Sequence, residues 1–157
     1  MSNVRHHEEL LEAVDELVEI NETTPVIVEG IRDVRALRAL GLRGVVEAVN
    51  HGTSVFAMCE RLARTAKAAV ILTDWDRRGG QIARQLRDGL AANGVRGVEE
   101  PRAKLARLCQ KEIKDVESLD GHVARARDAV AEGRTGKESK RYYGRTRLAE
   151  RGRRAGR

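Results

Sequence analysis

Residues Ala68 to Gly80 read AAVILTDWDRRGG, the pattern of a buried strand that runs directly into the start of a helix. The segment Ala68 to Leu72 is the longest uninterrupted apolar stretch of the chain, and its β-branched residues favour an extended strand. Two acidic residues, Asp74 and Asp76, close this stretch before a Gly-Gly pair opens the helix. In an open parallel sheet, ligands bind at the carboxyl ends of the strands. The stretch therefore predicts both a strand and a polar site at its end.

Short β-branched runs alternate with helical segments on both sides of this stretch. The alternation predicts βαβ units and an α/β fold with a mainly parallel, four-stranded sheet flanked by helices. Gly41 and Gly94 stand where the C-caps of two helices are expected. The predicted strands cover 26–29, 44–49, 68–73 and 95–98, and the predicted helices between them cover 33–40, 53–65 and 80–93.

Further helices are expected before and after the sheet segment. A glutamate-rich amphipathic pattern predicts a helix over 4–20, and Pro101 favours the first turn of a helix over 101–111. A last helix is expected over 121–131. The predicted organisation is an N-terminal helix (1–22), an α/β domain (24–100), a C-terminal helical extension (101–132) and a basic flexible tail (133–157).

The positive charge of the chain is concentrated in this tail. Residues 133–157 contain ten Lys or Arg and two acidic residues, a net charge of +8, whereas the whole chain has a net charge of +6. Five glycines and few apolar residues prevent the tail from burying enough surface to fold alone, so a mobile basic arm is expected. Such arms bind nucleic-acid phosphates. The alternative is a solvated tail that only keeps the protein soluble.

The composition also argues against several classes of protein. Cys59 and Cys109 lie too far apart for a zinc ribbon or a C-x-x-C redox pair. The first residues lack a secretion signal, and no apolar run approaches the roughly 20 residues of a membrane span. We therefore expect a cytoplasmic protein with free thiols and no membrane partner. One Phe, one Trp and two Tyr are too few for a base-stacking platform.

Three acidic residues follow predicted strands and are candidates for chemistry. Glu29 closes one strand and precedes Gly30, which allows a sharp turn or the close approach of a ligand. The i, i+2 spacing of Asp74 and Asp76 predicts that both carboxylates share one face of an extended chain. Neighbouring carboxylates repel unless a proton or a cation neutralises them, and Mg²⁺ is the natural cation for hard oxygen ligands.

The helix that follows Asp76 adds groups suited to a phosphate. Its N-terminus offers unpaired N–H groups and the positive end of a dipole, and Arg77 and Arg78 supply positive charge. The structural alternative is that Asp74 and Asp76 only cap this helix, that Glu29 is a surface acid, and that the two arginines lie in solvent.

Two motifs in combination resemble those of the Toprim domain. Residues 29–33, EGIRD, match the pattern E-G-x-x-D, and residues 74–79, DWDRRG, match D-x-D-x-x-G. The resemblance covers about residues 24–98 and includes the order of strands and helices. It implies a compact, Rossmann-like Toprim fold of the kind shared by DnaG-type primases, type IA and type II topoisomerases, several nucleases and the bacterial 5S ribosomal RNA maturase.

The resemblance also implies a role for each acidic residue. The motif glutamate of Toprim domains is a general acid or base and the aspartates bind magnesium. Glu29 would be the catalytic acid or base and a metal ligand, Asp74 would bind the catalytic Mg²⁺, and Asp76 would bind a second Mg²⁺. Asp33 is expected to cap the next helix rather than to bind metal.

One motif position departs from the family pattern. Many small relatives carry a lysine where this chain has Ile31, and Arg32 or Arg35 is the candidate replacement for its charge. A short helix before one Toprim domain, the Trp within TDWDR, and the later segment 114–119 (KDVESL) resemble an archaeal family of small, stand-alone Toprim proteins.

The expected function is Mg²⁺-dependent phosphoryl transfer on RNA or DNA, as nuclease or RNA-maturase-like cleavage. Topoisomerases and self-sufficient primases need further modules, which 157 residues do not accommodate. The alternatives are a non-catalytic, Mg²⁺-binding nucleic-acid or ribonucleoprotein module, and a subunit of a larger primase or RNA-processing complex. The candidate phosphate and nucleic-acid contacts are Gly30, Arg77, Arg78, Gly79, Arg141, Arg145, Arg147, Arg153 and Arg154.

Four other residues complete the expectations. Trp75 should point away from the carboxylates and pack against the following helix. His51 follows a predicted strand and gives a weak hint of proximity to the site, while Lys114 and Glu117 would bring a charged pair near it or form a solvated turn. The roles of His51, Lys114 and Glu117 are left open.

Overall fold

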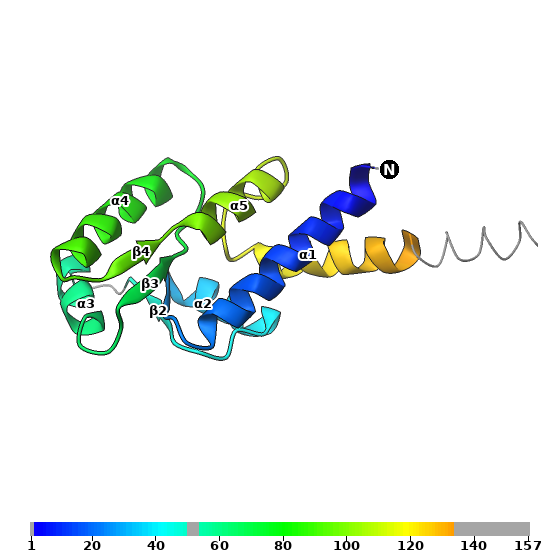
Figure 1. Cartoon of the computed structure of the whole chain (residues 1–157). Coiled ribbons are helices and arrows are strands. Elements are labelled where there is room, and N and C mark those ends of the chain that lie inside the picture. Colours follow the sequence, from blue (N-terminus) through cyan, green and yellow to red (C-terminus); the bar gives the residue numbers. More distant parts are fainter. Residues whose placement is uncertain (1, 50–53, 134–157) are drawn as a thin grey trace, which may run out of the picture.

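Four short parallel strands form the centre of the structure, a computed structural model that describes residues 2–49 and 54–133 (Figure 1). The strand order is β2-β1-β3-β4, so β1 and β3 are the central pair. The parallel sheet predicted from the sequence is confirmed, with Val26 of β1 opposite Val46 of β2 and Val70 of β3. The strands are β1 (Val26–Val28), β2 (Val46–Ala48), β3 (Ala68–Ile71) and β4 (Arg96–Val98).

Every predicted helix is present, with boundaries shifted by a few residues. Gly41 has a φ of 108° at the C-cap of α2 and Gly94 a φ of 74° just after α4, which confirms both glycines as helix ends. α4 begins at Arg77 rather than at residue 80, because Asp76 caps it. The helices are α1 (Ser2–Asn21), α2 (Ile31–Leu40), α3 (Val55–Leu62), α4 (Arg77–Ala92), α5 (Glu100–Cys109) and a last helix over 119–133.

The alternation of side chains along the strands builds one apolar core on each face of the sheet. Ile27 and Ile71 point into the smaller core, which α3 and α4 cover. Val28 and Val70 point into the larger core, to which α1, α2, α5 and the last helix contribute. The helices outside the sheet segment therefore share a core with the sheet.

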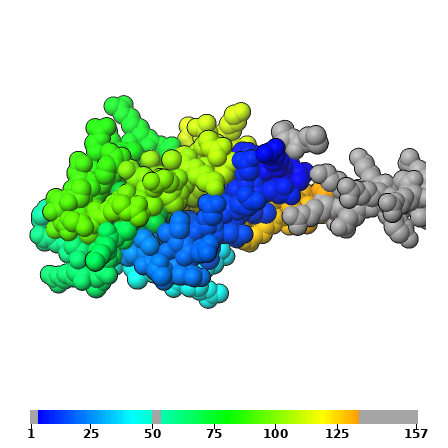
Figure 2. All heavy atoms as spheres, viewed as in Figure 1, coloured from blue at the N-terminus to red at the C-terminus, as the bar shows by residue number. Residues whose placement is uncertain are grey.

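α1 and helix 119–133 extend together beyond one end of the sheet (Figures 1 and 2). A Cβ atom on Gly133 would lie 3.1 Å from Val4 Cγ2, so the last helix ends beside the start of α1. Residues 134–157, and with them nearly all of the predicted basic tail, lie outside the described residues, as does His51. In the part that the structure describes, no helix is long and apolar enough to cross a membrane.

Candidate metal site

The two central strands bring Glu29 and Asp74 together. Glu29 directly follows β1, and Asp74 lies three residues after the end of β3. The backbone N–H of Asp74 donates a hydrogen bond of 2.7 Å to Glu29 Oε2. The first and second sequence motifs therefore meet at the carboxyl edge of the sheet, where the sequence predicts the site.

The electrostatics of this pair disfavour two negative charges. The pKa of Glu29 is raised to about 7, mainly by burial and also by the negative charges of Asp74 and Asp76, whereas the hydrogen bond from the Asp74 N–H opposes the rise. Burial also raises the pKa of Asp74, to which the charges of Asp115 and Asp76 add, while hydrogen bonds from Val116 and Glu29 oppose the rise. Either a shared proton or a cation would relieve this repulsion.

Asp76 occupies a different position from the one that strand alternation predicts. β3 ends at Ile71, so Asp74 and Asp76 lie in a loop, and the argument from alternating side chains does not apply to them. Asp76 Oδ1 accepts a hydrogen bond of 2.6 Å from the Gly79 N–H, which makes Asp76 the N-cap of α4. Asp76 therefore caps α4, its charge still acts on Glu29 and Asp74, and its role as a metal ligand stays a prediction.

The glycines of the two motifs serve different purposes. A Cβ atom on Gly79 would lie 1.8 Å from the carbonyl oxygen of Asp74, so the tight loop requires glycine there. Thr73 Oγ1 donates a hydrogen bond of 2.7 Å to the Gly79 carbonyl and closes the same loop. A Cβ atom on Gly30 would meet only Asp33 Oδ2, at 3.9 Å, and the backbone of Gly30 is extended. Packing therefore does not require glycine at position 30, which leaves open space beside Glu29.

Asp33 caps the start of α2, as predicted. Its Oδ2 accepts a hydrogen bond of 3.0 Å from the Gly30 N–H. The side chain is buried, and burial raises its pKa, to which the charges of Asp74, Glu117 and Asp115 add. Asp33 therefore fixes the loop that carries Glu29 and adds to the negative character of the site.

Two contacts to Asp74 were missed by sequence reasoning. Arg102 of α5 donates hydrogen bonds to the carbonyl oxygens of Asp74 at 2.7 Å and Thr73 at 3.0 Å. The backbone N–H of Val116 donates a hydrogen bond of 2.9 Å to Asp74 Oδ1. Nothing in the local pattern distinguishes Arg102 from the other cations of a helix. The segment before helix 119–133 was noted as one that could lie near the site, but not as a partner of Asp74.

Trp75 packs on the opposite side from the one predicted. Its ring lies against the larger core, with Ile113, whereas α4 covers the smaller core. The indole Nε1 donates a hydrogen bond of 2.7 Å to the carbonyl oxygen of Ile113, and the Trp75 N–H donates one of 3.0 Å to that of Lys114. Trp75 thus holds the segment that reaches Asp74.

Comparison with known proteins decides the family. The Toprim domain family matches residues 24–108 of this chain. The chain belongs to the Toprim family. Toprim domains generally bind Mg²⁺ and work on nucleic acids, and the match includes both acidic motifs.

Several archaeal proteins match about four fifths of the Toprim chain. It is 41% identical to a UPF0292 protein of Methanosarcina barkeri over 132 residues, which cover 81% of this chain and 92% of that one. A UPF0292 protein of Methanocaldococcus jannaschii is 32% identical over 124 residues, or 78% and 96% of the two chains. A solved structure of a protein from Aquifex aeolicus shares the fold, with a TM-score of 0.61 and 22% identity over 68% of this chain and 94% of that one.

The Toprim acids fit a magnesium ion that keeps most of its water. Within residues 2–49 and 54–133, no three His, Cys, Asp or Glu side chains are arranged as a ligand set for a metal. Mg²⁺ is usually held by one or two carboxylates together with water and substrate phosphate. Glu29 and Asp74 provide two hard oxygen donors with raised pKa values. A second ion at Asp76 remains a prediction.

The other candidate residues of the Toprim site are dispersed. Arg77 and Arg78 are exposed in the first turn of α4. Glu117 forms an exposed ion pair of 3.7 Å with Arg32, and the exposed Lys114 contacts Trp75 through its backbone only. The predicted tail contacts Arg141, Arg145, Arg147, Arg153 and Arg154 lie outside the described residues.

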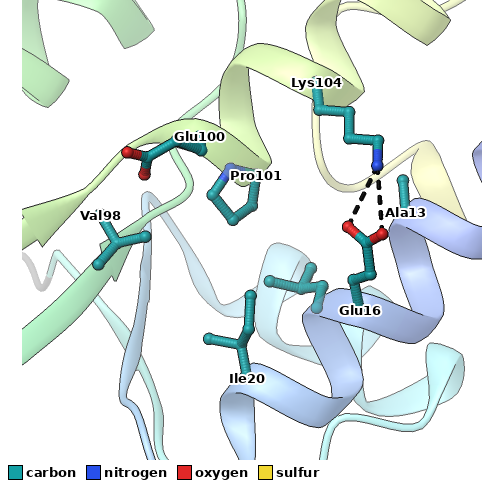
Figure 3. Close-up of a pocket in the computed structure, with 8 residues that line it drawn as sticks. Ala13, Glu16, Ile20, Val98, Glu100, Pro101 and Lys104 are labelled. Carbon is teal, nitrogen blue, oxygen red and sulfur yellow. Dashed lines mark hydrogen bonds and ion pairs between the residues drawn. The ribbon is translucent and has the colours of Figure 1, made fainter.

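An apolar cavity of about 280 Å³ lies apart from the Toprim acids, between α1 and α5 (Figure 3). Lys104 and Glu16 form an ion pair of 3.1 Å across its rim. None of the motif residues lines it, so it plays no part in the metal site. Its lining residues are Ala13, Glu16, Leu17, Ile20, Val98, Glu100, Pro101 and Lys104.

Proposed function

We propose that this chain catalyses Mg²⁺-dependent phosphoryl transfer on nucleic acid, as nuclease or RNA-maturase-like cleavage of a phosphodiester bond. The observation that carries the proposal is the Glu29–Asp74 pair at the carboxyl ends of the central strands, joined by a 2.7 Å hydrogen bond. The Toprim match supports the general class of magnesium-binding nucleic-acid proteins.

Glu29 is the proposed general acid or base. A group whose pKa lies near the working pH is the most effective in proton transfer, and the pKa of Glu29 in the metal-free protein is raised to about 7. In the proposed reaction Glu29 takes a proton from the attacking oxygen or gives one to the leaving oxygen. Its hydrogen bond from the Asp74 N–H fixes the carboxyl group in the site.

Glu29 and Asp74 would hold the magnesium ion, with Asp76 as the proposed ligand of a second ion. A bound Mg²⁺ supplies positive charge that polarises the phosphodiester and offsets negative charge as the bond breaks. Phosphate contacts are proposed for Arg77 and Arg78 and for their backbone N–H groups at the start of α4. The Gly79 N–H is already bonded to the Asp76 side chain.

Divalent-metal-dependent cleavage of labelled structured RNA, single-stranded DNA and duplex DNA tests this function. The intact chain is compared with Glu29→Gln, with the double variant Asp74→Asn, Asp76→Asn, and with Glu12→Gln, an exposed acid on α1. Cleavage that needs Mg²⁺, is lost in the first two variants and persists in the control would support the proposal.

A failure of cleavage would favour one of the alternatives. Salt-sensitive binding without cleavage, lost on deletion of residues 133–157, would support a non-catalytic nucleic-acid or ribonucleoprotein module. Cleavage that appears only after addition of a cell extract fraction would support a subunit of a larger primase or RNA-processing complex.

A further inference from the structure

The segment Ile113–Val116, here called the strap, lies beyond the residues that match the Toprim family and nevertheless contacts the second motif. Trp75 donates to two strap carbonyls, at Ile113 (2.7 Å) and Lys114 (3.0 Å). The strap returns a hydrogen bond of 2.9 Å from the Val116 N–H to Asp74 Oδ1. Hydrogen bonds therefore join the motif and the strap in both senses, because Trp75 donates to the strap and the strap donates to Asp74.

The bond from Val116 restricts the rotation of the Asp74 carboxylate. One of its oxygens is held by the strap, and the carboxyl also interacts with that of Glu29. A metal ligand whose second oxygen is held in place loses less freedom on binding, and the loss of such an outer partner weakens metal binding about 10- to 100-fold. The strap is therefore placed to set the affinity of the proposed metal site.

The strap is anchored independently of Trp75. Val116 is fully buried in the larger core. At the other side of the strap, Asp115 Oδ1 accepts a hydrogen bond of 2.7 Å from the Ser118 N–H, just before helix 119–133. Removal of the indole N–H alone would loosen the strap without detaching it from the core.

We propose that the strap strengthens metal binding by restraining the Asp74 carboxylate, and that Trp75 is the positioning residue that holds the strap against Asp74. The inference rests on the proposed function only in that Glu29 and Asp74 bind a divalent ion. It adds to the Toprim motifs a region outside them, through which the C-terminal helix is connected to the site.

Metal binding is the first test, measured by calorimetry with Mg²⁺ and by Mn²⁺ electron paramagnetic resonance. Trp75→Phe keeps an aromatic ring in the core but lacks the N–H, and we expect it to bind the ion about tenfold more weakly with little change in Tm. Lys111→Ala is the matched control, because Lys111 is an exposed lysine that lies just before the strap and outside it. This control should bind the ion as the intact chain does.

Nuclear magnetic resonance provides a second readout on the intact chain, which contains one Trp. We expect the Trp75 indole N–H signal to shift during a Mg²⁺ titration with the same Kd as metal binding, and the shift to be absent in Asp74→Asn. Equal metal affinity of Trp75→Phe and the intact chain would overturn the strap proposal and leave the proposed function standing. Absence of metal binding by the intact chain would overturn both.

Discussion

At the scale of single residues, the site is defined by two acids with raised pKa values and by one glycine. Glu29 and Asp74 carry raised pKa values because they are partly buried beside each other. Asp76 is held in place as a helix cap, and Gly79 is the residue that allows the Asp74 carbonyl to approach α4. Each of these features predicts a measurable effect.

The stability of the metal-free protein should fall as the pH rises from about 4.5 to about 7. The pKa of Glu29 is raised from 4.5 to about 7, so the folded state binds this proton more tightly than the unfolded chain does. The stabilisation is complete below the lower value and is lost as the pH rises through the upper one. Because the group is only half-buried, we expect about 1–2 kcal/mol.

Urea denaturation in EDTA at several pH values checks this prediction. The stability difference between the intact chain and Glu29→Gln cancels the contributions of titrating groups that do not interact with Glu29. The free energy of unfolding of the intact chain, relative to that of Glu29→Gln, should fall between pH 4.5 and 7. A difference that is constant with pH would show that Glu29 titrates normally.

Gly79→Ala should destabilise the protein by about 3 kcal/mol or more, because backbone atoms cannot yield to a Cβ placed 1.8 Å from the Asp74 carbonyl oxygen. Gly80→Ala is the matched control, since its nearest neighbour would be Arg102 Nη2 at 4.0 Å. Alanine at this helical position should raise stability by about 0.5–1 kcal/mol. Thermal denaturation of both variants would measure the two stability changes. Equal changes in Gly79→Ala and Gly80→Ala would contradict the prediction.

At the scale of elements, α5 and the strap hold the Asp74 loop from two sides. Arg102 bonds two loop carbonyls from α5, and Val116 bonds the Asp74 carboxylate from the strap. Neither element carries a motif acid. The geometry of the site therefore depends on the helices that follow the sheet.

Loss of the two hydrogen bonds from the Arg102 guanidinium should destabilise the Asp74 loop. Arg102→Met removes two hydrogen bonds, and we expect a loss of about 2 kcal/mol in the free energy of unfolding. Arg102→Lys should restore less than half of this loss, because an ammonium lacks the planar fork that reaches both carbonyls. Arg107→Met, an exposed residue of the same helix, is the control. Full rescue by lysine would indicate that only charge matters.

The elements of the fold could be predicted from the sequence, and part of the site could not. The β-branched runs and Gly41 and Gly94 are local signals, and they located strands and helices to within a few residues. Asp74 and its partner Val116 stand 42 residues apart, and Arg102 stands 28 residues from Asp74. Such contacts depend on how α5 and the strap pack, which leaves no periodic pattern in the chain.

At the scale of the whole molecule, the motif acids and most of the net positive charge are separated along the sequence. The acids of the site lie at the edge of the sheet, whereas the tail carries a net charge of +8. Deletion of residues 134–157 should flatten the dependence of log affinity for duplex nucleic acid on log salt by up to about seven units, at about 0.9 for each neutralised phosphate. The Mg²⁺ affinity should not change. An unchanged slope, measured by fluorescence anisotropy, would show that the tail does not contact phosphates.

Helix 119–133 sets the distance between the strap and the start of the basic sequence. Its 15 residues, at 1.5 Å each, span about 22 Å from the strap beside Asp74 to the residue after which the basic sequence begins. A duplex held at both ends of this helix covers about six base pairs at 3.4 Å per step. A substrate that reaches both the acids and the start of the basic sequence must therefore extend over about 22 Å.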